Sequence, residues 1–309
     1  MNAGNRRAVL AAMLANGGIA VAKFVGWGFT GAASLLAEAV HSLADTSNQG
    51  LLLWGGAAAA RAPTRDHAFG FGRERYFWSF VVALVIFSLG SLFAIYEGVS
   101  KVLHPHALTD PAWAIGILLV AIGLETFSFR TAIVEARLQK GEASWWIFIR
   151  RTKNPELPVV LLEDLGALLG LVIALCGVAL AVWTGDPRFD AAGSIAIGVL
   201  LGAIAVVLAI EMKSLLIGES ASLRHEDAIR KACLAQEHVR RIIHLRTQHI
   251  GPEEILVATK LEFDPELSFR ELASAIDAVE VRIRAVLPFS ALIYVEPDVY
   301  QDRATPAPT

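Results

Sequence analysis

A histidine and an aspartate four residues apart lie inside an otherwise apolar stretch of this sequence. His41 and Asp45 share one face of a helix at this spacing. Imidazole nitrogen and carboxylate oxygen together suit zinc and other borderline divalent metals better than magnesium or calcium, which prefer oxygen ligands alone. One helix does not complete a tetrahedral site, so a second helix must contribute ligands.

A second apolar stretch carries two adjacent acids, Glu163 and Asp164, close to its beginning. Carboxylates are costly inside a membrane and usually mark an ion pathway. We take His41, Asp45 and Asp164 as the principal candidate ligands. Glu163 points about 100° away from Asp164 on a regular helix. It therefore binds the metal only if the helix deforms, or else it contacts a ligand rather than the metal itself. Asn48, one turn beyond Asp45, is the other candidate.

Other readings of these residues stay open. In a soluble protein a His–Asp pair is more often a simple hydrogen-bonded pair than a metal site, but two apolar stretches that both carry ionisable groups favour an ion pathway. Lys23 either faces the interior or extends to the membrane surface. Glu125 and Arg130 suggest an interhelical ion pair or a proton path, and we favour a purely structural pair.

The elements that must position these groups are membrane helices. Of the 309 residues, 55% are hydrophobic and 18% are charged, and the mean hydropathy is +0.52, which is too apolar for an ordinary soluble protein. A helix needs roughly 20 apolar residues to cross a bilayer. Six stretches meet this requirement and predict six transmembrane helices: 8–29, 34–58, 77–100, 112–134, 158–183 and 189–215.

Charge sets the predicted orientation and excludes one class of partner. Arginine and lysine gather in alternate loops, which predicts that both termini are cytoplasmic. The net charge of -3 shows no basic excess, so we expect no nucleic-acid partner.

Charged residues return after Gly218, where the periodicity changes. Helical spacing over 226–237 and 269–286, with strand-like runs at 239–250, 255–263 and 291–295, predicts the order αββαβ. We therefore expect an α-helical membrane protein with a C-terminal cytoplasmic α+β domain. The predicted boundaries are 1–217 for the six-helix transmembrane domain, 218–300 for the cytoplasmic domain and 301–309 for a disordered tail.

Familiar enzyme motifs are absent from the sequence. It contains no phosphate-binding loop, no His-Glu-x-x-His and no Gly-x-Ser-x-Gly, so we expect neither an enzyme nor a bound cofactor. A gradient must then drive transport. Protons are the simplest choice, because histidine and carboxylates lose protons when they bind metal. Two rivals are a membrane receptor or scaffold that binds metal without moving it, and an intramembrane hydrolase, for which no nucleophile is paired with a base.

Several motifs resemble the cation diffusion facilitator family along nearly the whole chain. The resemblance is carried by residues 16–26, similar to the family's first helix, residues 34–45, similar to its metal-binding helix, and residues 67–73, similar to the following loop. Residues 161–164 and 185–190 are most similar to the branch that contains the mitochondrial zinc transporter nine.

The resemblance implies a homodimer whose cytoplasmic domains have a metallochaperone-like, ferredoxin-like fold, and metal/proton antiport by alternating access. It places His41, Asp45 and Asp164 in the transport site. Val160 stands where the family usually carries a fourth ligand, His or Asp, so that ligand is left open. Lys260 and Tyr294 replace histidines of metal-sensing members, which implies no typical regulatory metal cluster.

We therefore expect a multi-pass protein of a bacterial inner membrane or an equivalent organelle membrane. Its expected function is to export a divalent metal ion, with zinc favoured, from the cytoplasm in exchange for protons. The expected partners are the metal ion, protons, the lipid bilayer and a second copy of the chain.

Overall fold

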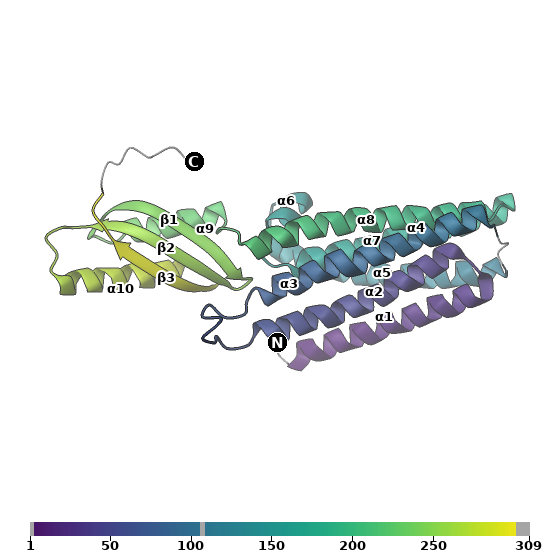
Figure 1. The fold of residues 1–309 in the computed structure, drawn as a ribbon, viewed down its shortest axis with the longest axis horizontal. Coiled ribbons are helices and arrows are strands. Elements are labelled where there is room, and N and C mark those ends of the chain that lie inside the picture. The colour runs from purple at the N-terminus through teal and green to yellow at the C-terminus, as the bar shows by residue number, and fades with distance from the viewer. Residues whose placement is uncertain (1–2, 106–108, 301–309) are drawn as a thin grey trace. The chain divides into compact units, whose positions relative to one another are not determined.

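A computed structural model describes residues 3–105 and 109–300 (Figure 1). For residues 3–16, 85–87, 89, 139 and 151 the description covers the backbone alone. The tail predicted at 301–309 lies outside the described residues. The chain divides into two compact units, one of residues 1–61 with 74–213, the other of residues 62–73 with 214–309. Each unit is described separately below.

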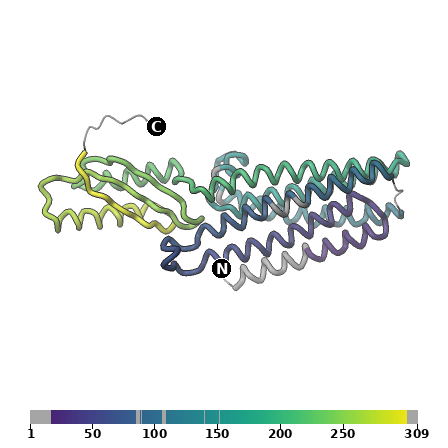
Figure 2. Tube along the Cα trace, in the orientation of Figure 1, coloured from purple at the N-terminus to yellow at the C-terminus, as the bar shows by residue number. Residues whose placement is uncertain are grey.

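The first unit is a bundle of long helices. Helical structure covers all six predicted stretches, and the third is divided by a π-helical segment. The elements are α1 (Ala3–Thr30), α2 (Ala33–Ala59), α3 (Glu74–Val81), η1 (Val82–Phe87), α4 (Ser88–Leu103), α5 (Pro111–Lys140), α6 (Trp145–Arg151), α7 (Glu156–Thr184) and α8 (Arg188–Ile217). Figure 2 traces the chain as it doubles back between α1 and α2.

Where the side chains are described, three helices are long and apolar enough to cross a membrane: Pro111–Leu138 within α5, Glu156–Thr184 and Arg188–Ile217. Two of the other predicted stretches differ in ways that the structure shows. α2 carries a row of buried polar side chains, and the π-helical segment leaves α3 and α4 as two shorter helices. The structure thus supports a helical membrane domain, and passage of all six stretches through a bilayer is taken up as a proposal below.

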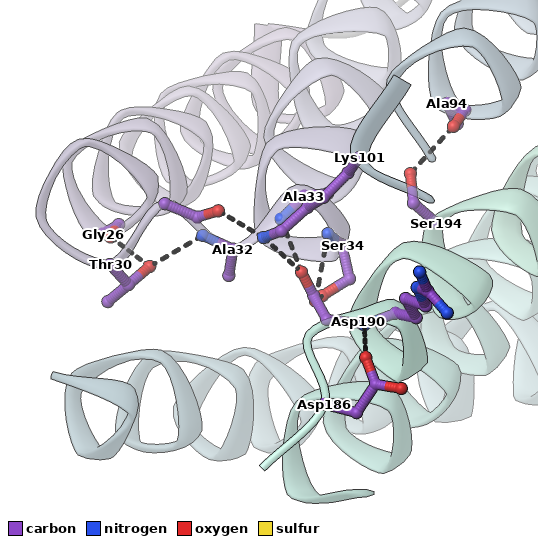
Figure 3. Close-up of polar contacts among 12 residues, drawn as sticks. Gly26, Thr30, Ala32, Ala33, Ser34, Ala94, Lys101, Asp186, Asp190 and Ser194 are labelled. Carbon is purple, nitrogen blue, oxygen red and sulfur yellow. Dashed lines mark hydrogen bonds and ion pairs between the residues drawn. The ribbon is translucent and has the colours of Figure 1, made fainter. Parts of the chain in front are cut away.

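Asp190, in the first turn of α8, caps the N-terminus of α2 (Figure 3). Its carboxylate accepts hydrogen bonds from the backbone N–H of Ala33 at 2.8 Å and of Ser34 at 3.3 Å, and from the Ser34 hydroxyl. Lys101 of α4 lies 2.9 Å from the same carboxylate and donates to the carbonyl of Gly31 at 2.5 Å. A carboxylate stabilises a helix N-terminus because its charge opposes the helix dipole. These contacts hold α2, α4 and α8 together.

A tight hairpin joins α7 to α8. α7 ends at Thr184 and α8 begins at Arg188, and Gly185 adopts a φ of 73° at the C-cap of α7. A left-handed residue at this position is most easily supplied by glycine. The hairpin places Asp190 at the same end of the bundle as the turn between α1 and α2.

Small residues let α4 and α8 approach closely. The Ser91 hydroxyl donates to the carbonyl of Gly198 at 2.6 Å, and the Ser194 hydroxyl donates to the carbonyl of Ala94 at 2.8 Å. A methyl group added at Gly98 would lie 2.7 Å from the Ala191 carbonyl oxygen. Hydroxyl–carbonyl bonds and close backbone contact are typical of packed membrane helices.

The second unit confirms the predicted order αββαβ. It contains α9 (Leu223–Leu234), β1 (Val239–Gly251), β2 (Glu254–Phe263), α10 (Phe269–Val286) and β3 (Ser290–Pro297). β2 lies in the centre of the sheet, antiparallel to β1 and parallel to β3. Alternate residues of β2 are buried, because one face of the sheet packs against both helices. The core includes Ile229, Cys233, Val257, Leu261, Val279 and Ile283.

Candidate functional site

A row of buried polar side chains follows one side of α2. Its members recur three or four residues apart, the spacing that keeps residues on one face of a helix. They are Ser34, Glu38, His41, Ser42, Asp45 and Asn48, all at most 6% exposed. We call this set the polar row. Burial of so many polar groups is costly unless they pair or bind an ion.

The predicted pair of His41 and Asp45 lies in the middle of the polar row. The Nδ1 atom of His41 is 3.5 Å from an Oδ atom of Asp45. Both side chains are buried. The spacing in the sequence therefore does bring these two groups together.

The two adjacent acids of α7 face different neighbours. Glu163 is 4% exposed and accepts a hydrogen bond from the side-chain amide of Asn48 on α2. Asp164 is half-buried and accepts a hydrogen bond at 3.1 Å from the hydroxyl of Ser128 on α5. The divergence agrees with the 100° step of a regular helix. It gives Glu163, rather than Asp164, the direct contact with α2.

Asp164 nevertheless belongs to the same group of charges. It interacts electrostatically with both Asp45 and Glu163. The candidate site therefore lies among α2, α5 and α7, and the five residues named from the sequence all border it. Their assignment as metal ligands remains a prediction.

Glu125 of α5 is a further acid at this site that sequence reasoning did not place there. It is 7% exposed, one helical turn from Ser128, and it interacts electrostatically with Asp45, Glu163 and Asp164. No ion pair joins it to Arg130 among the described residues, because a five-residue separation turns the two side chains about 140° apart on a helix. The two residues thus form no structural pair with each other.

A signal for Glu125 was present in the sequence. The buried positions of α5 recur every three or four residues at Ala114, Leu118 and Ala121, and Glu125 continues this series. An acid on the same helix face as these buried apolar residues is expected to point into the bundle as well.

The donor set is suited to a metal ion but is not preassembled. Val160 is half-buried and has no donor atom. Among residues 3–105 and 109–300, no group of three or more His, Cys, Asp and Glu side chains converges as a complete metal centre. One nitrogen donor and several carboxylates on three helices can converge through small side-chain and helix movements. Such a site suits an ion that is bound and released.

The sequence of the helical unit matches the family described as the cation efflux transmembrane domain over residues 9–217. Residues 222–298 match the family described as the cation efflux protein, cytoplasmic domain. A helical membrane bundle with a buried polar site, together with a small α+β domain, agrees with these two matches. The chain belongs to the cation efflux family.

Several relatives support this assignment. The chain is 33% identical to the mitochondrial proton-coupled zinc antiporter SLC30A9 of Xenopus laevis over 92% of its own length and 51% of that protein. It is 31% identical to SLC30A9 of Mus musculus over 84% of its length and 46% of that protein. It is 26% identical to the zinc transporter ZitB of Escherichia coli over 82% of its length and 76% of that protein. The chain spans about half the length of the SLC30A9 proteins.

Proposed function

We propose that this chain carries divalent metal ions, with zinc favoured, across a membrane in exchange for protons. The observation that supports this most is the buried His41–Asp45 pair of α2, which lies in one charge cluster with Glu163 and Asp164 of α7. Nitrogen and carboxylate donors together favour zinc over magnesium and calcium. Relatives named as zinc antiporters and as a zinc transporter support the same cargo.

Proton exchange follows from the chemistry of the ligands. Several carboxylates at close range disfavour one another's ionisation, so the cluster without metal retains protons. Metal binding requires deprotonated ligands and releases those protons. One set of groups therefore binds either a divalent ion or protons, which couples the two movements in opposite directions.

His41, Asp45 and Asp164 are the proposed ligands, and Glu163 is the proposed fourth. Glu163 already lies against α2 through Asn48, so it replaces the donor that Val160 lacks. Asn48 orients the Glu163 carboxylate and remains the alternative oxygen donor.

The proposed membrane arrangement has six spans in residues 1–217, a cytoplasmic domain in residues 218–300 and both termini in the cytoplasm. α1, α2 and the α3–α4 segment cross the bilayer as well, and the polar side chains of α2 face the interior of the bundle. Alternating access exports metal from the cytoplasm, and two copies associate. The match to the family's cytoplasmic domain supports this assembly.

Zinc uptake into proteoliposomes under an imposed pH gradient tests the proposal. Wild-type protein should show saturable flux that collapses with the gradient. Asp45→Ala and Asp164→Ala should abolish the flux, whereas Glu135→Gln, at an exposed acid of α5, should leave it unchanged. Zinc binding without flux in the wild type would instead favour a receptor.

A further inference from the structure

A fully buried ion pair lies beside the proposed site without belonging to it. The ammonium group of Lys23, on α1, is 3.1 Å from one carboxylate oxygen of Glu38 and 2.7 Å from the hydroxyl of Ser42. Lys23 and Glu38 are both 0% exposed. Lys23 therefore faces the interior of the bundle, one of the two alternatives left open by the sequence.

Glu38 uses only one of its two carboxylate oxygens in this pair. Within the described part of the chain, its Oε1 atom is buried and accepts no hydrogen bond. That oxygen lies against Gly170 of α7, at the place where any larger residue would put its Cβ. A buried carboxylate oxygen without a donor is costly, and it is a ready ligand for a cation.

Glu38 lies on the polar row between the proposed site and the end of the bundle where α1 turns into α2. It precedes Asp45 by seven residues, which is about 10 Å along a helix at 1.5 Å per residue. The ammonium charge of Lys23 also acts on Asp45 and Glu125. An ion leaving Asp45 along α2 toward that end would next encounter Glu38.

We propose that Glu38 is a second metal-binding position on the ion path, which the Lys23 ammonium group occupies until a divalent ion displaces it. The two contacts of Lys23 explain how the exchange proceeds. When the ion takes the Glu38 carboxylate, Lys23 keeps its hydrogen bond to Ser42, so the cation retreats without losing every partner. This inference rests on the proposed function, since it concerns the path of the same metal ion.

Because of this exchange, a metal ion stays at the second position only briefly. A divalent ion at Glu38 lies close to the displaced ammonium charge, and like charges in a bundle of low dielectric repel strongly. Lys23 then returns to Glu38 as the ion departs. A neutral residue at position 23 would remove both the competitor and the repulsion, and the ion would remain bound.

Equilibrium binding of zinc to detergent-purified protein, measured by calorimetry, tests the proposal. Wild type should bind one zinc ion per chain at the main site. Lys23→Met should bind two, and the second should disappear in Lys23→Met combined with Glu38→Gln. The matched control is Lys101→Met, which breaks another buried lysine–carboxylate pair. It should bind one ion, because Asp190 keeps its three donors from α2.

Flux through Glu38→Gln gives a second, independent measurement. Glutamine keeps the shape of the side chain but leaves Lys23 without a counter-charge on the path. Zinc flux should fall at least about tenfold, equivalent to a barrier higher by about 1.4 kcal/mol, while binding at the main site is retained. Lys23→Met combined with Glu38→Gln should recover part of the flux, since the unpaired cation is gone.

The possible outcomes distinguish a failure of the proposed transport function from a failure of the proposed role of Glu38. No zinc binding and no flux in wild type would overturn the proposed function. Wild-type flux with one bound ion in Lys23→Met, or full flux in Glu38→Gln, would overturn only the role of Glu38. If Lys23→Met does not fold, Glu38→Gln decides, because a purely structural pair predicts loss of main-site binding and of flux together.

Discussion

Replacing Asp190 by asparagine should destabilise the helical bundle strongly, because it removes the charge that caps α2 and pairs with Lys101. Asparagine offers one acceptor oxygen where the carboxylate receives hydrogen bonds from Ala33, Ser34 and Lys101. Its amide group is a donor and would face other donors. The Lys101 side chain, 4% exposed, would be left as a buried cation.

The expected cost combines two effects that share the same atoms. Removing one partner of a buried ion pair costs about 3 to 5 kcal/mol, and losing a helix N-cap costs about 0.5 to 2 kcal/mol. The two overlap, so about 3 to 5 kcal/mol is expected for Asp190→Asn. On the scale of soluble domains of 150–250 residues, this lowers the melting temperature by about 6 to 20 °C.

Thermal unfolding of the purified protein in detergent measures this effect. Asp190→Asn combined with Lys101→Met should be more stable than Asp190→Asn alone, because the stranded cation is removed. The control is Asp186→Asn in the same hairpin, where the carboxylate accepts a solvent-exposed hydrogen bond from the Arg188 N–H at 3.0 Å; the melting temperature of this variant should hardly change. A melting temperature for Asp190→Asn within about 2 °C of wild type, or additive losses in the double variant, would refute the reasoning.

Three further predictions concern the proposed fourth ligand and the cytoplasmic domain. Val160→His adds a nitrogen donor one turn before Asp164 and should tighten zinc binding at least about tenfold by calorimetry; unchanged affinity would mean that the position does not face the site. Burial raises the pKa of the Cys233 thiol to about 11 from 9.0, so alkylation at pH 8 should be about 100-fold slower in folded than in denatured protein, and equal rates would contradict this. Hydrogen bonds from Ser268 lower the pKa of Glu271 below 4.5, so this cap stabilises α10 above pH 4.5 and loses its effect as pH falls through the lower folded value. Ser268→Ala should therefore lower the melting temperature more at neutral pH than in strong acid, where only the hydrogen bond from the Glu271 N–H to the Ser268 hydroxyl is lost, and an equal loss at both would count against the contribution of the Glu271 carboxylate.

Much of the fold was predictable because its signals are local. Apolar runs marked the long helices, and Gly185 with Pro187 marked the hairpin between α7 and α8. The alternation along β2 similarly marked a half-buried strand. The π-helical segment Val82–Phe87 was not predictable, since it consists of apolar residues with no distinguishing pattern.

The site was predictable only in part. His41 and Asp45 come together because they are four residues apart on one helix, and this spacing is visible in the sequence. Which of two adjacent acids faces α2 depends on how α7 is rotated, and that rotation is set by tertiary packing. The contact of Glu163 with Asn48 and the burial of Glu125 therefore required the structure.

The paired hydroxyl bonds between α4 and α8 restrict how this bundle is able to change shape. Ser91 donates from α4 to α8 and Ser194 donates from α8 to α4. A slide by one helical turn, about 5.4 Å, would break both bonds at once and drive the backbone at Gly98 into bulkier neighbours. Such a slide is therefore disfavoured, and a movement that keeps α4 and α8 together as one unit costs less.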